Sequence, residues 1–141
     1  MYDYTKVYKS NSILTAEPGK LVLILFDAAL KSMRIAKEAL DRPQRDLERI
    51  AICNKELTKT RLIIDELNGS LDLSQPGEFG ISMRNLYNYF YRRLLEADMK
   101  KDQSIIAEVE NLLTEIRDAW EEMLKKYASE RESTLVLEPC A

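Results

Sequence analysis

The chain has 141 residues, of which 45% are hydrophobic and 32% charged, and it carries a formal net charge of −3 with no histidine. This length fits a single domain, and the few glycines and prolines favour a helical protein over a disordered or all-β one. The negative charge disfavours nucleic acid and anionic membranes as partners, and the lack of histidine excludes Ser-His-Asp and Cys-His catalytic sites and ordinary zinc sites. We therefore expect no metal or cofactor, and no nucleic-acid or membrane partner.

Nothing in the sequence is typical of a secreted or membrane-spanning protein. The longest unbroken apolar run, Leu21 to Phe26, is far shorter than the ~20 residues of a spanning helix. The N-terminal stretch MYDYTKVYKS lacks the apolar region of a signal peptide. We expect a cytoplasmic protein.

Residues 1–14 form the first recognisable unit, which we interpret as an N-terminal arm. The stretch is polar, contains three tyrosines and has no sustained hydrophobic period. Two alternatives are open: the arm is a frayed terminus, or Tyr8 and Ile13 dock into an apolar surface.

A first helix is predicted from Thr15–Pro18 to about Leu40. A proline in the first turn costs no needed hydrogen bond, and Pro43 ends the helix. Further apolar residues, including Leu21 and Leu25, lie outside the main apolar stripe, so this helix is either central or presents an apolar surface to a ligand. The stripe, spaced by four and three residues as in a helical bundle, is Val22, Phe26, Ala29, Met33, Ala36 and Leu40.

A second helix is predicted from about Gln44 to Asn68. Cys53 lies on its apolar stripe and is expected to be a buried apolar residue rather than a nucleophile. Gly69 suits a left-handed helix cap, and the glycine- and proline-containing stretch that follows is the one long connection. The stripe consists of Leu47, Ile50, Cys53, Leu57, Thr60, Ile64 and Leu67.

A third helix, from about Ile81 to Lys100, contains the stretch LYNYFYRRLLEAD and has more apolar surface than one core contact requires. One stripe consists of Met83, Leu86, Phe90, Leu94 and Ala97. A second stripe beside it consists of Tyr87, Tyr91 and Leu95. The second stripe must be covered either by neighbouring helices or by another chain.

A fourth helix, capped by Asp102 or Ser104, is predicted to return antiparallel to the third and to end near Tyr127. Its expected core stripe is Ile105, Val109, Leu112, Ile116, Ala119, Met123 and Tyr127, with Ile106, Leu113 and Trp120 flanking it. Four amphipathic segments predict an all-α, antiparallel, up-down four-helix bundle over residues 15–127. Residues 128–141 lose the pattern and are expected to form a mobile C-terminal tail.

Several of these segments together resemble the flagellin export chaperone family, FliS. The resemblance rests on Tyr8 and Ile13 followed by TAEPGKLVLILFDAAL, and on LYNYFYRRLLEAD followed by DQSIIAEVENLLTEIRDAWEEM. It covers most of the chain up to about Tyr127. The chain differs from the usual family pattern mildly, for example at Glu17 and Asp98.

The resemblance implies a cytoplasmic chaperone without enzymatic activity. Such a protein would bind the C-terminal segment of flagellin, prevent premature polymerisation, and deliver flagellin to components of the flagellar type III export gate. It also implies that the arm covers an apolar groove, which the client occupies when bound. The partner-binding residues expected on this basis are Tyr8, Ile13, Leu21, Leu25, Tyr87, Tyr91 and Leu95.

Two other functions are weighed against this one. A helical bundle with the same apolar surface could act as a self-associating adaptor or structural protein, forming a weak homodimer. An enzyme could use a carboxylate-only metal site built from Glu108, Glu115 and Glu122, but these residues have the spacing of a solvated acidic ridge.

Overall fold

The computed structural model describes residues 4–8, 18–41 and 46–137, with side chains described only to residue 130 in the last range. A short 3-10 helix, η1 (Tyr4–Val7), is followed by four α-helices: α1 (Pro18–Ala39), α2 (Leu47–Gly69), α3 (Phe79–Lys100) and α4 (Gln103–Leu137). In these ranges, no helix combines the length and the hydropathy needed to cross a membrane.

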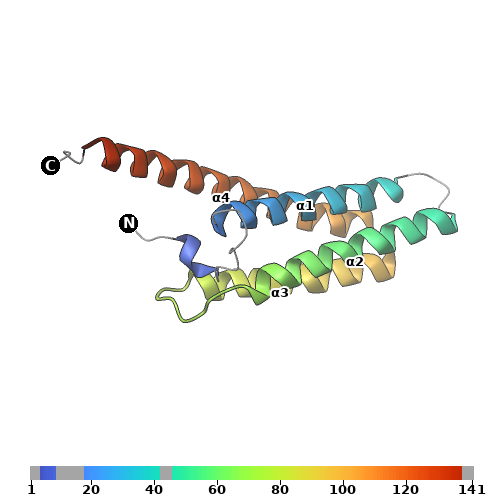
Figure 1. Ribbon diagram of the computed structural model, residues 1–141. Helices are drawn as coiled ribbons and strands as arrows, with labels where there is room; N and C mark the ends of the chain where they lie inside the picture. Colours follow the sequence, from blue (N-terminus) through green and yellow to red (C-terminus); the bar gives the residue numbers. More distant parts are fainter. Residues whose placement is uncertain (1–3, 9–17, 42–45, 138–141) are drawn as a thin grey trace.

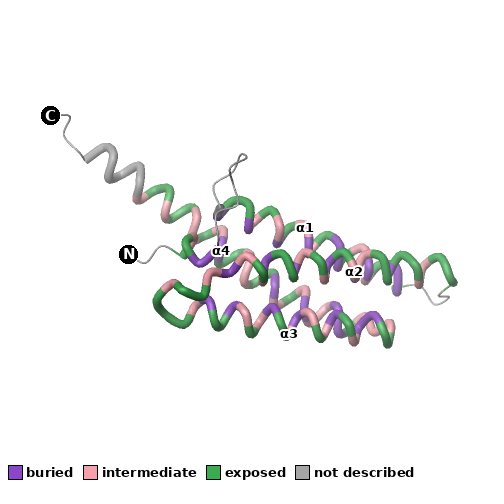
Figure 2. Tube along the Cα trace, turned by 60° about the horizontal axis from the view of Figure 1, so that its bottom comes forward, coloured by how far each residue is buried: buried purple, intermediate pink, exposed green. Residues whose placement is uncertain are grey.

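The four α-helices form the predicted antiparallel up-down bundle (Figure 1). α1 packs against α2 and α4, and α3 packs against the same two helices, so α1 and α3 occupy diagonal corners. Buried residues line the inward side of each helix and exposed residues the outward side (Figure 2). The all-α prediction is thereby confirmed.

The core stripes expected for α1 and α2 are largely confirmed. All six positions of the first stripe, from Val22 on α1 to Leu40 just after its end, are buried, and Cys53 is fully buried on α2. Leu47 is an exception, being 86% exposed, because it lies in the first turn of α2 at the end of the bundle (Figure 1). The prediction that Gly69 adopts a left-handed cap is wrong: α2 continues through Gly69, and Ser70 caps it in a right-handed conformation.

The expected stripes of α3 and α4 need correction. On α3, Tyr87 is fully buried and Leu86 only half-buried, so the tyrosine of the second stripe belongs to the core. On α4, the flanking residues Leu113 and Trp120 are buried, whereas Ala119 is exposed. Spacing by three and four residues cannot distinguish two neighbouring stripes when both are apolar.

The turn between α3 and α4 was predicted correctly. Lys101 adopts a left-handed conformation, and the Asp102 amide donates to the carbonyl of Ala97. The Asp102 carboxylate then accepts from the Ser104 amide at 2.9 Å, as an N-cap does. At its far end α4 continues to Leu137 rather than ending near Tyr127, and it projects past the start of α1 (Figure 1).

Candidate functional site

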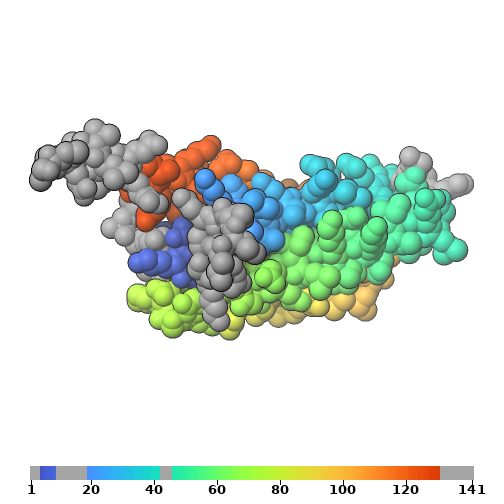
Figure 3. All heavy atoms as spheres, viewed as in Figure 1, coloured from blue at the N-terminus to red at the C-terminus, as the bar shows by residue number. Residues whose placement is uncertain are grey.

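Residues 4–8, which we call the docked segment, lie against the bundle at the end where α1 and α3 begin. Val7 and Tyr8 are 1% and 4% exposed and belong to the core. The Val7 carbonyl accepts a hydrogen bond from the Asp72 amide, and Tyr8 forms an isolated antiparallel bridge with Leu71. In Figure 3 the docked segment lies between α4 and the α2–α3 connection. This part of the predicted arm is therefore a packed element.

The side chain of Tyr8 connects the docked segment to the bundle. Its hydroxyl forms a buried hydrogen bond with the hydroxyl of Tyr87 on α3. Its ring meets Trp120 of α4 edge to face, with ring centroids 5.5 Å apart, and Trp120 meets Phe26 of α1 in the same manner at 6.4 Å. Trp120 Nε1 also donates to the carbonyl of Gly19 at 2.8 Å. Trp120 thus connects the docked segment to the start of α1.

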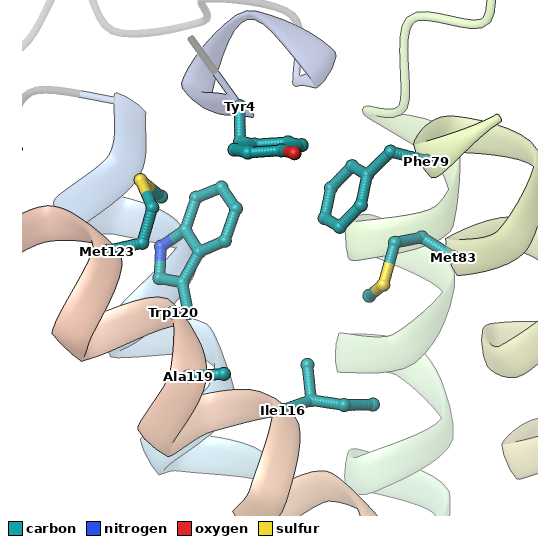
Figure 4. Close-up of a pocket in the computed structure, with 7 residues that line it drawn as sticks. All are labelled: Tyr4, Phe79, Met83, Ile116, Ala119, Trp120 and Met123. Atoms are coloured by element: carbon teal, nitrogen blue, oxygen red, sulfur yellow. The ribbon is translucent and has the colours of Figure 1, made fainter. Parts of the chain in front are cut away.

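A largely apolar cavity of about 310 Å³ lies next to the docked segment, between η1, α3 and α4 (Figure 4). Tyr4 forms one wall, with its ring 4.9 Å from that of Phe79, and is itself 38% exposed. Side chains from the two long helices form the other walls. The lining residues are Tyr4, Phe79, Met83, Ile116, Ala119, Trp120 and Met123.

This cavity explains why part of α4's expected core stripe is not fully buried. Ile116, Ala119 and Met123 face the space between α3 and α4 rather than the centre of the bundle. Methionines adapt to differently shaped apolar partners, and aromatic rings supply large contact area. The cavity is therefore suited to binding apolar side chains.

The structure brings together only some of the predicted partner-binding residues. Tyr8 and Tyr87 are in contact and buried, while Leu25 and Tyr91 are half-buried against the core. The others are exposed or lie outside the described residues: Leu21 is 38% exposed, Leu95 is 42% exposed, and Ile13 is not described. Leu21 lies near the start of α1 and Leu95 near the end of α3, at opposite ends of the bundle.

Sequence reasoning missed most of the cavity's lining. Phe79 was assigned to a connection, and Met83 and Met123 were assigned to the core. A signal was present on α4, where two adjacent apolar stripes, one through Ile116 and one through Trp120, make the helix face wider than one core contact requires. Such a surplus was interpreted as a possible binding surface for the first and third helices, but not for the fourth.

Of the acidic residues considered for a metal site, Glu108 is engaged in ordinary surface pairing. Arg93 binds Glu108 through two hydrogen bonds, at 3.0 and 3.2 Å, and these hold the pKa of Glu108 below its usual value. Tyr89 also donates to Glu108 at 2.5 Å. Over the described part of the chain, no three His, Cys, Asp or Glu side chains are grouped so that they could hold a metal ion.

The buried tyrosine pair predicts a pH dependence. Burial raises the pKa of both hydroxyls above the ordinary value of 10.0. A group whose pKa is higher in the folded state contributes stability that is present below its unfolded pKa and is lost as the pH rises above it. Docking of residues 4–8 is therefore expected to persist up to about pH 10 and to weaken above it.

Emission from Trp120, the chain's single tryptophan, measures this effect because Tyr8 packs against it. The change above pH 10 should shrink in the variant Tyr8→Phe/Tyr87→Phe, which cannot ionise at either position. A transition centred well below pH 9, or one of equal size in the double variant, would contradict the assignment.

Comparison with known proteins identifies the family of this chain. A family model described as Flagellar protein FliS matches residues 1–127. The flagellar secretion chaperone FliS of Bacillus subtilis (strain 168) is 40% identical over 124 residues, covering 88% of each chain. The protein of the same description from Salmonella typhimurium is 34% identical over 131 residues, which are 92% of this chain and 93% of the relative.

A solved structure has the same fold. It is described as the crystal structure of a flagellar chaperone from bacteria, and it aligns with a TM-score of 0.70 at 18% identity. The alignment covers 83% of this chain and 91% of the other. On the family match and the two sequence relatives, this chain belongs to the FliS family of flagellar secretion chaperones.

Proposed function

We propose that the protein is a cytoplasmic chaperone that binds the C-terminal segment of flagellin through the apolar site between α3 and α4. It keeps flagellin from polymerising prematurely and assists its delivery to the flagellar type III secretion apparatus. One observation carries the proposal: the cavity and the Trp120 surface next to it are partly covered by a short segment of the same chain, residues 4–8. An apolar site with a tethered cover fits a protein that exchanges the cover for a client.

The physical requirement is that burial outweighs ordering. A disordered client loses conformational entropy when it binds, at a cost of roughly 1–2 kcal/mol per ordered backbone residue. Burial of apolar surface returns about 25 cal/mol per Å², so a client must cover a broad surface and not the cavity alone. An amphipathic helix laid along α3 and α4 meets this requirement, with apolar side chains entering the cavity.

The other predicted contact residues extend this surface in the proposal. Leu21 and Leu25 lie in the first half of α1, and Tyr91 and Leu95 lie in the second half of α3. A client that contacts both groups would have to wrap around the bundle. In the proposal, the client competes with Tyr8 of the docked segment for the contact with Tyr87.

Binding is tested by titrating the purified full chain with a synthetic flagellin C-terminal segment in a calorimeter. We expect a one-to-one complex. The variant Met123→Asp places a charge in the wall of the cavity and should weaken binding at least tenfold, since an unpaired charge is costly in an apolar contact. The matched control is Leu62→Asp, at an apolar residue of α2 that is 64% exposed and does not line the cavity.

The opposite result would favour the self-associating alternative. Absence of binding at tens of micromolar, together with a stable homodimer in sedimentation, would contradict the chaperone proposal. Equal weakening by Met123→Asp and Leu62→Asp would show that the client binds elsewhere.

A further inference from the structure

Tyr87 has a buried hydroxyl that needs a hydrogen-bond partner from whatever occupies the site. Its side chain is 0% exposed, and its hydroxyl hydrogen-bonds to Tyr8 of the docked segment. Among the described residues, the Tyr8 hydroxyl is the hydrogen-bond partner of the Tyr87 hydroxyl. The rest of the α3 stripe, Met83, Phe90, Leu94 and Ala97, is apolar, so packing alone would be satisfied by phenylalanine at this position.

The Tyr87 hydroxyl loses its hydrogen-bond partner, Tyr8, when the docked segment leaves the bundle. That departure is a step that rests on the function proposed above. A client that covers the vacated space with purely apolar atoms would leave this hydroxyl buried and unpaired, which weakens binding by roughly fivefold to a hundredfold. A client that supplies a new hydrogen bond avoids this loss.

We infer that Tyr87 makes the site selective for a client side chain with an apolar body and an uncharged hydrogen-bonding tip, of the chemistry that Tyr8 itself presents. Tyrosine fits best, because its ring can also meet Trp120 edge to face as Tyr8 does. Threonine, asparagine and glutamine carry shorter versions of the same combination.

The surroundings exclude a charged tip. Trp120 and Phe26 lie against the site, and burying an ion beside them without a counter-ion is far more costly than burying a hydroxyl or an amide. The raised pKa values of Tyr8 and Tyr87 agree with this, because burial disfavours the ionised form of each.

A competing interpretation is that the tyrosine pair only fastens the docked segment. Under that interpretation, removing the Tyr87 hydroxyl changes the affinity of every client by the same factor, because each client competes with the same segment. Under ours, it changes the ratio between clients with and without the polar tip. The ratio cancels the contribution of the docked segment.

The test measures that ratio. In a synthetic flagellin C-terminal segment, each tyrosine, threonine, asparagine and glutamine is replaced singly by phenylalanine, valine, leucine and methionine respectively. Every peptide is titrated against the full chain and against Tyr87→Phe. We expect one position at which the replacement weakens binding roughly fivefold to a hundredfold with the full chain and less than twofold with Tyr87→Phe.

The matched control is Tyr89→Phe, at a half-buried tyrosine of the same helix whose hydroxyl donates to Glu108 rather than to the docked segment, and it should leave every ratio unchanged. If no replacement depends on Tyr87, or if Tyr89→Phe has the same effect, the inference is overturned while the proposed function stands. If the unmodified segment binds none of the three proteins, both are overturned.

Discussion

Replacing Trp120 with alanine is expected to lower the free energy of unfolding by about 3–5 kcal/mol, as large-to-small changes at buried aromatic positions do. Trp120 is 5% exposed and lies between Tyr8 of the docked segment and Phe26 of α1. Its indole nitrogen also donates a hydrogen bond to the carbonyl of Gly19. One substitution therefore removes packing on both sides together with this hydrogen bond. Urea unfolding followed by circular dichroism measures the change.

Two further variants, one at Trp120 and one at a neighbouring residue, are compared with Trp120→Ala. Trp120→Phe keeps an aromatic ring but loses the nitrogen donor, and should cost less than the alanine variant. Met123→Ala removes a half-buried side chain from the same wall of the cavity, one turn further along α4, and should cost less than either. A loss below about 1 kcal/mol for Trp120→Ala would contradict the central position of this residue.

Deleting residues 1–14 is expected to leave the bundle folded and to increase affinity for the client about tenfold. Burial of Val7 and Tyr8 contributes about 3–6 kcal/mol, and the hydrogen bonds of the segment about 1 kcal/mol each. Ordering the five residues costs roughly 5–10 kcal/mol, so docking is nearly balanced. A docking free energy of about 1.4 kcal/mol corresponds to a tenfold reduction in apparent affinity, which the deletion removes.

The deletion also exposes the surfaces that Val7 and Tyr8 cover, so self-association should rise at high concentration. Calorimetric titration with the flagellin segment and sedimentation measure the two effects. Deletion of residues 138–141 is the control, because it applies the same operation to the other terminus. Weaker binding after removal of residues 1–14 would show that the arm holds the client rather than competing with it. Global unfolding would show that the arm is indispensable to the core.

The fold followed from the sequence to a large extent because local signals agreed. The buried stripe of α1 was predicted in full, and the turn at Lys101–Asp102 was correctly identified as the antiparallel return. Each of these depends on residues close in sequence. The end of α4 was placed too early, since a helix can continue past its last core contact and loses only a weak pattern when it does.

The candidate site was harder to predict because it depends on contacts between residues far apart in sequence. Tyr8 and Tyr87 were both singled out, but nothing in their spacing showed that they bond to each other. Phe79 appeared to belong to a loop, and it lines the cavity because α3 begins two residues earlier than expected, opposite Tyr4. Which of two apolar stripes faces a neighbouring helix is decided by the packing of the whole bundle.

The central claim is that client and docked segment compete for one site, and hydrogen exchange tests it most directly. The Asp72 amide donates to the Val7 carbonyl when residues 4–8 are docked, so its exchange reports on docking. We predict that saturation with the flagellin C-terminal segment increases exchange at Asp72 and across residues 4–8, while amides in the middle of α2 keep their protection. Unchanged exchange at Asp72 and residues 4–8 with the client fully bound would contradict the account.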